Sequence, residues 1–284
     1  MRYLGADLEG KVAVVTGGSG ILGREFCRAL LKAGANVAIL GINENAGNEA
    51  VASLKAEGFE QVASFVCNVL EKSDVEKARL EINALFGTCD ILINAAGGNH
   101  PSGTTTKEFY EAGDEDSEAA NITFFNLEKS SIDFVFGLNF MGTVIPSQVF
   151  AKDMVKKKEA SIVNISSMNA FTPLTKIPAY SAAKAAINNF TQWLAVYFSK
   201  TNIRVNAIAP GFFETTQNEA LLRNSDGTYS ARAHKIINSS PMERFGKPDE
   251  LLGTLMYLVN TEASGFVTGV VIPVDGGFNA YSGV

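Results

Sequence analysis

The feature that most constrains the fold is an alternation of short apolar segments with longer helix-like segments along most of the chain. Seven short segments rich in Val, Ile and Ala predict buried strands: residues 11–16, 36–40, 62–67, 90–94, 161–166, 203–208 and 270–274. Longer segments between them predict helices: residues 21–33, 44–57, 73–86, 131–156 and 180–199. Apolar strands that alternate with helices indicate a parallel sheet covered on both faces and joined by right-handed crossovers. The sequence therefore predicts a doubly wound α/β fold.

The chain has 284 residues, which is enough for one large α/β domain or two smaller ones. No change in composition requires a second domain, so we predict a single domain over residues 1–284. Two polar, irregular connections interrupt the alternation, at residues 97–130 and 215–246. Both follow strand ends on the side where ligands bind in such sheets, so we expect them to shape a substrate site. Surface decoration is the alternative.

Composition argues against several classes of function. The formal net charge of −6 argues against a nucleic-acid partner or an anionic membrane surface. No uninterrupted apolar run approaches the roughly 18 residues that a bilayer span needs, and the first residues lack the apolar segment of a secretory signal. Cys27, Cys67 and Cys89 are widely spaced, which is typical of a reduced, cytoplasmic protein with cysteines packed as small apolar residues. His100 and His234 are isolated, so we predict no metal site.

The glycine-rich segment TGGSGILG, residues 16–23, fits three known motifs in part. A phosphate-binding P-loop needs Lys and Ser or Thr after its last glycine, where this protein has Arg24 and Glu25. A nucleophile elbow needs glycine two positions after its serine, where this protein has Ile21. The dinucleotide fingerprint fits, because the glycines follow a predicted strand and open a predicted helix. The alternative is a purely structural turn.

A second motif carries the chemistry. Tyr180 and Lys184 are four residues apart, so they share a face of the predicted helix, and the ammonium lies beside the phenol. We expect this cation to lower the pKa of Tyr180 and so favour the phenolate. Ser167 lies thirteen residues earlier, directly after a predicted strand, where its hydroxyl can hydrogen-bond a substrate carbonyl. The three residues predict proton transfer to or from a carbonyl oxygen.

This assembly resembles the short-chain dehydrogenase/reductase family over essentially the whole sequence. The family's motifs occur in order: TGGSGILG (16–23), NAAG (94–97), NFMGT (139–143), ISS (165–167), YSAAK (180–184), NAIAPGFFET (206–215), RFGKP (244–248) and VDGG (274–277). The resemblance implies a Rossmann domain whose seven-stranded parallel sheet has the order 3-2-1-4-5-6-7. It also implies that Tyr180 is the general acid in ketone reduction and that Ser167 orients the carbonyl. Lys184 would bind the nicotinamide ribose, and Asn139 would complete a proton relay through water.

The resemblance further implies a site for NAD(H) or NADP(H). The residues expected to line it are Gly17, Ser19, Gly20, Ile21, Leu22, Gly41, Asn43, Asn68, Val69, Asn94, Ala95, Gly97, Tyr180, Lys184, Pro210, Gly211, Phe213 and Thr215. Two positions depart from the family pattern, because Ile21 replaces a glycine and Asn68 replaces an aspartate that holds adenine. Residues 41–43 supply neither the acid typical of NAD sites nor the arginine typical of NADP sites. We favour NAD(H) on the subfamily resemblance that follows.

Within the family, the sequence is most similar to the D-mannonate oxidoreductases (fructuronate reductases) of the short-chain type, on residues 94–106, 165–198, 209–218 and 276–284. This similarity implies a sugar-acid substrate and the interconversion of D-fructuronate and D-mannonate. We expect His100 and Asn169 to contact the substrate, with weaker candidates in Asn99, Lys176, Gln217, Arg223, Arg232 and His234. The alternatives are a reductase of another keto-sugar, polyol or 3-oxoacyl substrate, and a non-catalytic dinucleotide-binding regulator. The family usually forms homotetramers, and we expect one here.

Overall fold

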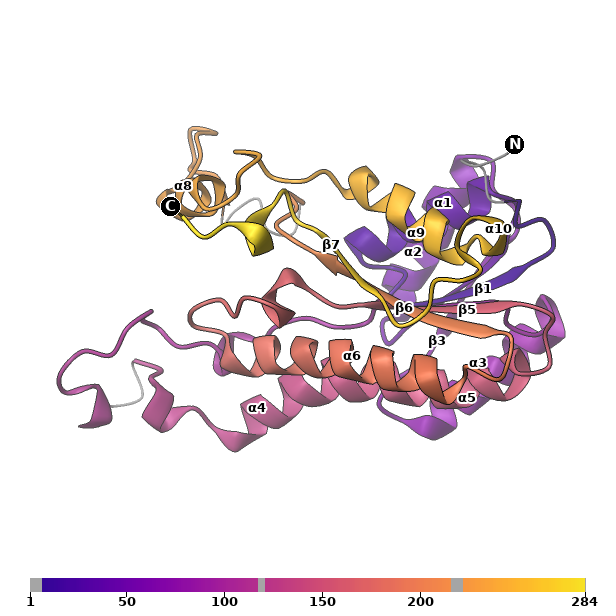
Figure 1. The fold of residues 1–284 in the computed structure, drawn as a ribbon, viewed down its shortest axis with the longest axis horizontal. Coiled ribbons are helices and arrows are strands. Elements are labelled where there is room, and N and C mark those ends of the chain that lie inside the picture. Colours follow the sequence, from indigo (N-terminus) through magenta and orange to yellow (C-terminus); the bar gives the residue numbers. More distant parts are fainter. Residues whose placement is uncertain (1–6, 117–120, 216–221, 284) are drawn as a thin grey trace.

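The structure is a computed structural model that describes residues 7–116, 121–215 and 222–283. Its centre is a seven-stranded sheet in the order β3-β2-β1-β4-β5-β6-β7, with every neighbouring pair parallel (Figure 1). The strands are β1 (Val12–Thr16), β2 (Asn36–Gly41), β3 (Val62–Val66), β4 (Ile91–Asn94), β5 (Ala160–Ile165), β6 (Ile203–Pro210) and β7 (Val271–Val274). The predicted α/β class and strand order are confirmed.

Helices cover both faces of the sheet. They are α1 (Ile21–Lys32), α2 (Glu44–Ala56), α3 (Lys72–Leu85), α4 (Lys129–Phe136), α5 (Gly142–Met154), α6 (Pro178–Tyr197), α8 (Ala231–Asn238), α9 (Leu252–Val259) and α10 (Thr261–Ser264). Alternate strand residues point to opposite faces, so Ala13 and Val15 pack with α1, α2 and α9, while Val12 and Val14 pack with α3, α5 and α6. The two apolar layers follow directly from the apolar strands, whose every residue is buried in β1, β4, β5 and β6.

Helices after β6 were missed from the sequence. The prediction has no helix between residues 208 and 270, where the structure has α8, α9 and the short α10. Leu255 and Leu258 of α9 are buried in the layer that contains α1. Helix α9 is apolar almost throughout its eight residues, so it lacks the alternation with polar residues by which an amphipathic helix is found.

The predicted helix 131–156 is interrupted. It is observed as α4, one π-helical turn (Gly137–Met141) and α5. Together they form the one stretch in the described parts of the protein, Lys129–Met154, that is long and apolar enough to cross a membrane. In an apolar part of it 18 residues long, 50% is buried, and α5 packs on α3 and on β4 and β5 of the sheet. Counting uninterrupted apolar residues missed this stretch because polar residues such as Asp133 and Asn139 divide it.

The three cysteines are free and buried, as predicted. Burial raises the pKa of both the Cys27 and the Cys67 thiols to about 12, and raises that of Cys89 further still. Thiols with such a pKa remain protonated and unreactive at neutral pH.

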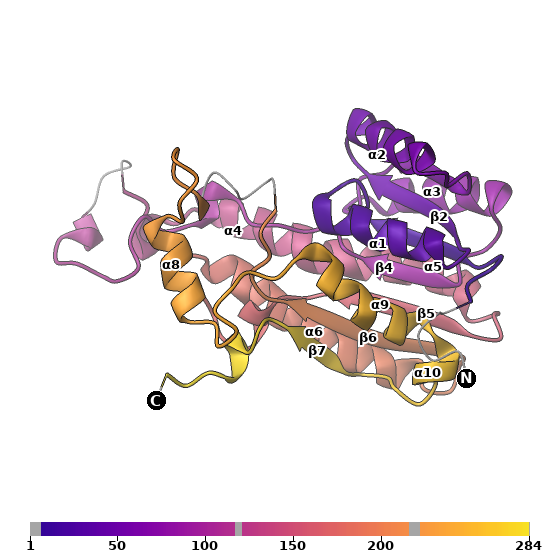
Figure 2. The ribbon, with the colours of Figure 1, turned by 90° about the horizontal axis from the view of Figure 1, so that it is seen from above.

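The carboxyl ends of the strands and the two long connections lie at the same end of the molecule. Figures 1 and 2 show the first connection projecting beyond α4, and α8 from the second connection lying at that end too. An ion pair between Glu108 and Lys235 joins the two connections directly. The fold therefore gathers segments distant in sequence around one edge of the sheet, where α/β proteins bind ligands.

Candidate active site

The glycine-rich turn between β1 and α1 leaves no room for side chains at two positions. Gly17 has a φ of +66°, and a Cβ atom there would lie 2.9 Å from Ala96 Cα. A Cβ atom on Gly23, in the first turn of α1, would lie 2.2 Å from the Gly17 carbonyl oxygen. The turn and helix α1 are therefore packed backbone against backbone, as a dinucleotide cradle requires.

The N-terminus of α1 is open to an anion. Gly20 is its N-cap, without a side chain to bond the free N–H groups, and its first turn holds no acidic residue. Ile21, which replaces the family's glycine, is the first helical residue, a position where glycine is not required. Free N–H groups and the positive end of a helix fit a pyrophosphate. The predicted cofactor residues Ser19 and Gly20 belong to the turn before α1, and Leu22 is the second residue of α1.

The residues that follow β2 and β3 fit a nucleoside. Asn43 caps α2, because its side-chain oxygen accepts from Ala46 N at 3.0 Å, while Ile42 before it is 72% exposed. Ser19 Oγ lies close to Gly41, 3.3 Å from where a Cβ atom would be. Asn68 Oδ1 accepts from the Leu70 amide, which leaves its NH₂ group as a donor toward a base, and the neighbouring Val69 is buried.

Two further predicted cofactor residues, Asn94 and Ala95, lie at the carboxyl end of β4 and directly after it. Asn94 is buried, and its Nδ2 donates to Asn164 Oδ1 at 2.9 Å and Ser147 Oγ at 3.0 Å, which ties β4 to β5 and α5. Its Oδ1 is buried without a hydrogen-bond partner. The segment after it is held by Thr16, whose hydroxyl accepts from both Ala95 N and Ala96 N at 3.1 Å. Asn94 Oδ1 is thus a buried acceptor without a partner, and the nearby segment at Ala96 touches Gly17, where a Cβ atom would not fit. Both observations fit a bound dinucleotide.

The remaining cofactor candidates follow β6. Pro210 is the last residue of β6, and Gly211 packs so closely that a Cβ atom there would lie 2.5 Å from Asp275 Cα. Phe213 is buried and pairs with Gly246 across an isolated parallel bridge. Thr215 lines the large cavity described below.

Ser167, Tyr180 and Lys184 are brought together as predicted. Ser167 is the residue after Ser166 at the carboxyl end of β5, and Tyr180 and Lys184 lie in the first two turns of α6. Lys184 Nζ lies 5.5 Å from the centre of the Tyr180 ring and donates to the Ile165 carbonyl at 2.8 Å. The fold thus anchors the ammonium on β5, the strand that also positions Ser167.

Asn139 lies beside these residues, within the π-helical turn. It is completely buried, and its Nδ2 donates to the Gly98 and Val135 carbonyls, both at 2.7 Å. Its Oδ1 accepts from Gly98 N at 3.1 Å. A Cβ atom on Gly97 would lie 2.6 Å from this Oδ1 and 3.4 Å from Lys184 Nζ, so Asn139, Gly97 and Lys184 form one contiguous group. Single π-helical turns often occur at functional sites.

Burial is the largest cause of the pKa shifts of Tyr180 and Lys184. Burial raises the pKa of Tyr180, opposed by its hydrogen bond with Ser167. The expected direction, a pKa of Tyr180 below its ordinary value, is therefore wrong for the structure described, because loss of water around the phenol raises this pKa. Burial also lowers the pKa of Lys184 to about 8. A tyrosine with a raised pKa remains protonated at neutral pH, which suits a proton donor.

The buried Lys184 makes stability depend on pH. Its pKa is about 8 in the folded protein against 10.5 in the unfolded state, so in this interval the unfolded state binds more protons and stability rises with pH. Relative to a Lys184→Met variant, we expect the wild type to gain about 2 kcal/mol of unfolding free energy from pH 7 to pH 10. Urea unfolding of both proteins across this range checks the prediction. A difference that stays constant with pH would contradict it.

A large cavity reaches the start of α6, where Ile177 lines it three residues before Tyr180. Its volume is about 1010 Å³, and it is lined by both long connections, by the loop before α6 and by the segment after β7. The predicted substrate residue His100 lines it, with its ring edge-on to Phe134 and its Nδ1 2.6 Å from Ser102 Oγ. Asn99, Lys176 and Arg232 also line it. The two long connections thus meet around one cavity at the ligand-binding edge.

The other substrate candidates lie elsewhere. Asn169 is buried beside Ser167, with its backbone N–H 3.3 Å from Ser167 Oγ and its Oδ1 without a hydrogen-bond partner. Arg223 and His234 are not among the residues that line the cavity. Arg223 pairs with Glu214, and His234 packs on Tyr229. Gln217 lies outside the described residues.

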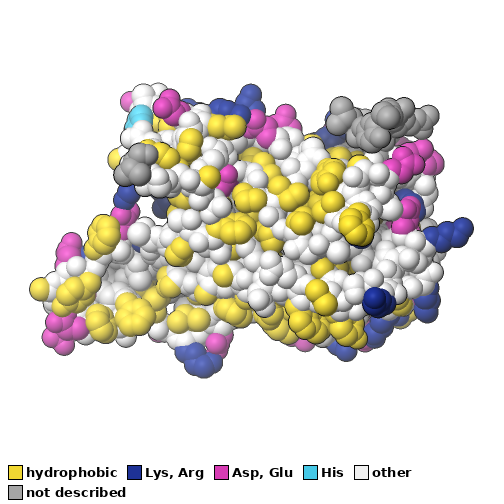
Figure 3. Space-filling model, viewed as in Figure 1, with side chains coloured by type: hydrophobic (Ala, Val, Ile, Leu, Met, Phe, Trp, Pro, Cys, Tyr) yellow, Lys and Arg dark blue, Asp and Glu magenta, His cyan; other side chains and the backbone are white. Residues whose placement is uncertain are grey.

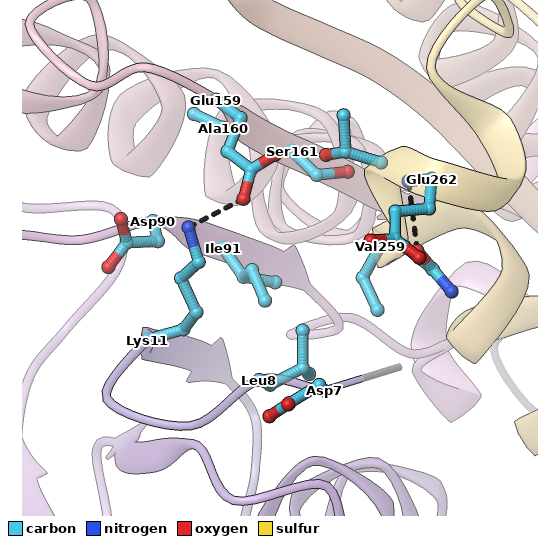
Figure 4. Close-up of a pocket in the computed structure, with 12 residues that line it drawn as sticks. Asp7, Leu8, Lys11, Asp90, Ile91, Glu159, Ala160, Ser161, Val259 and Glu262 are labelled. Carbon is cyan, nitrogen blue, oxygen red and sulfur yellow. Dashed lines mark hydrogen bonds and ion pairs between the residues drawn. The ribbon is translucent and has the colours of Figure 1, made fainter. Parts of the chain in front are cut away.

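A smaller pocket of about 210 Å³ lies at the opposite edge of the sheet, before the strands begin (Figure 4). There Lys11 donates to Glu159 at 2.7 Å, with Asp90 and Ser161 nearby. It is far from the carboxyl ends of the strands, where ligands bind in open α/β sheets. Within the described residues, no three His, Cys, Asp or Glu side chains are grouped to hold a metal ion.

Sequence reasoning missed two residues of the cofactor cradle. Thr16 fixes the segment after β4, and Gly23 permits the contact between α1 and the turn. Both belong to the TGGSGILG motif, whose spacing indicated a cradle but did not reveal which atoms touch. Close backbone contact was the missing signal, and it exists only in three dimensions.

Comparison with known proteins agrees with this geometry. The profile of the short chain dehydrogenase family matches residues 11–226. An uncharacterized oxidoreductase of Haemophilus influenzae is 53% identical over 98% of this protein and 96% of its own length. The uncharacterized oxidoreductase UxuB of Bacillus subtilis is 50% identical over the whole of both proteins, 100% of each.

A solved structure is also similar over its whole length. It is a Haemophilus influenzae protein provisionally described as a D-mannonate oxidoreductase and solved with bound NAD. It is 51% identical to the present protein, covers 100% of both sequences and superimposes with a TM-score of 0.94. The Gly-rich cradle, the grouping of Ser167 with Tyr180 and Lys184, and these similarities agree: the chain belongs to the short-chain dehydrogenase family and is an NAD(P)-dependent oxidoreductase.

Proposed function

We propose that this protein interconverts a sugar-acid ketone and its alcohol, with D-fructuronate and D-mannonate as the pair and NAD(H) as the cofactor. The observation that carries the proposal is the grouping of Ser167, Tyr180 and Lys184 at the start of α6, in a fold that also has a dinucleotide cradle. A cavity large enough for a hexose acid reaches Ile177, the residue before α6. The solved relative with bound NAD and a provisional D-mannonate oxidoreductase description supports the choice of substrate.

Each residue has a defined part in this chemistry. The nicotinamide, when bound, supplies the hydride that reduces the carbonyl carbon. Tyr180 holds the proton that the carbonyl oxygen receives, and its raised pKa keeps that proton in place at neutral pH. Ser167, hydrogen-bonded to Tyr180, positions the same oxygen. Lys184 is a buried ammonium beside the tyrosine ring, and Asn139 and Gly97 fix its surroundings.

The choice of NAD(H) rests on the end of β2. A 2′-phosphate is usually bound by an arginine near this position. Here the segment is Gly41, the exposed Ile42 and Asn43, whose side-chain oxygen is already used to cap α2. The next residue, Glu44, would repel a phosphate. This arrangement favours the uncharged 2′-hydroxyl of NAD(H).

The test is a panel of keto acids assayed with each cofactor. We expect NADH oxidation with D-fructuronate at a kcat/KM at least about 10-fold above that with tagaturonate or uncharged ketohexoses, since one mispositioned hydroxyl costs about 1–3 kcal/mol. NADH should be preferred over NADPH. Absence of turnover with every uronate would refute the substrate assignment and leave the family membership intact.

We also propose that the protein acts as a homotetramer in the cytoplasm. Support comes from an apolar face on α6, where Trp193 stacks on Tyr197 at 5.2 Å and both are more than half exposed. Figure 3 shows hydrophobic side chains along the edge of the molecule formed by this helix. Such a patch is typical of a protein–protein interface. Light scattering that gives the monomer mass of 30.3 kDa at micromolar concentration would contradict the assembly.

A further inference from the structure

The large cavity carries a surplus of positive charge in a protein that is negative as a whole. Its lining includes the three cationic side chains Lys176, Arg232 and Lys235, against one carboxylate, Glu108. The whole protein has a formal net charge of −6. A concentration of cations in one cavity of an acidic protein indicates that the cavity receives an anion.

One of the three cations is already paired. Lys235 on α8 and Glu108 in the first long connection form an ion pair. This hydrogen bond is the main cause that lowers the pKa of Glu108, and attraction from Lys176 and Arg232 lowers it further. Both cations line the same cavity as Glu108, yet within the residues that the structure describes neither forms an ion pair of its own. Two positive charges remain available beside the pair.

The backbone of Lys176 is held in a conformation that costs free energy. Its φ is +72°, in the left-handed region that non-glycine residues rarely adopt. The Lys176 carbonyl accepts from Thr105 N at 2.8 Å, which fixes the loop before α6 to the first long connection. Strained residues of this kind are concentrated at ligand-binding sites, and here the strain fixes a lysine at the cavity lining.

We infer that Lys176 and Arg232 form the subsite that binds the substrate's carboxylate, with the Glu108–Lys235 pair closing the cavity beside it. This inference rests on the proposed function, since it assigns one end of a sugar acid. Lys176 is four residues before Tyr180, in the loop that leads into α6, whereas Arg232 belongs to α8 on the other long connection. In a keto-hexuronate, hydroxyl-bearing carbons separate the carboxylate from the ketone, so the two ends require separate subsites. The buried amide of Asn169, unpartnered at Oδ1 beside Ser167, is placed to accept from one of the intervening hydroxyl groups.

The experiment compares an acid with a neutral polyol of the same carbon skeleton. Binding of D-mannonate and D-mannitol is measured by calorimetry on the Lys176→Gln/Arg232→Gln double variant and on wild type, each in the presence of NADH. Charge-assisted hydrogen bonds to a carboxylate are the strong ones, so we expect D-mannonate to bind about 100-fold more weakly to the variant. D-mannitol binding should not change. The KM for D-fructuronate should rise by a similar factor, with a smaller effect on kcat.

A matched control removes the same charge elsewhere. Lys158 and Lys200 are exposed and outside the cavity lining, so a Lys158→Gln/Lys200→Gln variant should bind D-mannonate like the wild type. Unchanged D-mannonate binding in the cavity variant, or an equal loss for D-mannitol, would overturn the subsite. Charge-dependent binding of D-mannonate without turnover of any keto-uronate would instead refute the proposed function and support the subsite as an anion site. Turnover of D-fructuronate that is unaffected by both substitutions would support the function and refute the subsite.

Discussion

Replacing Tyr180 with phenylalanine is expected to lower the kcat for ketone reduction by about 10³-fold, because a positioned general acid contributes roughly 10²–10⁴-fold. The substitution removes only the hydroxyl, so the ring beside Lys184 and the packing of α6 are retained. NADH affinity should therefore stay within about 2-fold of the wild type, since the cradle of Gly17 and Gly23 is untouched. Steady-state kinetics and NADH fluorescence titration give the two quantities.

The same helix provides the control. Tyr197 is at the C-terminal end of α6, 66% exposed, and a Tyr197→Phe variant should have wild-type kcat and NADH affinity. Turnover that persists at the wild-type rate in Tyr180→Phe would refute the assignment of the proton donor. It would also revive the alternative of a dinucleotide-binding regulator, which has no need of one.

Much of this site could be predicted because its signals are local. The strand, turn and helix around residues 16–23 are encoded by a few adjacent residues, and the spacing of Tyr180 and Lys184 places both on one helix face whatever surrounds them. The strand order came from resemblance to a family, and all seven strands pair in that order.

What could not be predicted depends on contacts between distant segments. The direction of the Tyr180 pKa was wrong because burial is a property of the folded protein, not of the pair. The π-helical turn at Asn139 accompanies its bonds to Gly98, 41 residues away. The ion pair of Glu108 with Lys235 spans 127 residues and joins two connections whose sequences are irregular. No periodicity in either connection indicates that they meet.

Introducing an alanine at Gly23 is expected to destabilise the protein by about 3 kcal/mol and to weaken NADH binding at least about 10-fold. The new Cβ atom would lie 2.2 Å from the Gly17 carbonyl oxygen and 2.8 Å from Gly18 Cα. Both neighbours are backbone atoms, so no side chain can rotate away, and α1 must move from the turn. That movement displaces the N–H groups at the N-terminus of α1, which face the pyrophosphate in the proposed complex. Urea unfolding and NADH titration measure the two effects.

A second helical glycine separates this packing effect from the helix propensity of alanine. Gly253 in α9 is exposed, and a Cβ atom there would meet nothing within 4 Å. Gly253→Ala should therefore leave NADH binding unchanged and stabilise the protein by about 0.5–1 kcal/mol, the ordinary gain from alanine over glycine in a helix.

If Gly23→Ala were as stable as the wild type and bound NADH equally well, the turn and α1 would not be in close backbone contact. The family's glycine motif would then be a loop of this protein in which a side chain at position 23 is tolerated. A loss confined to Gly23 would instead show that the glycine is required because two backbone segments touch there.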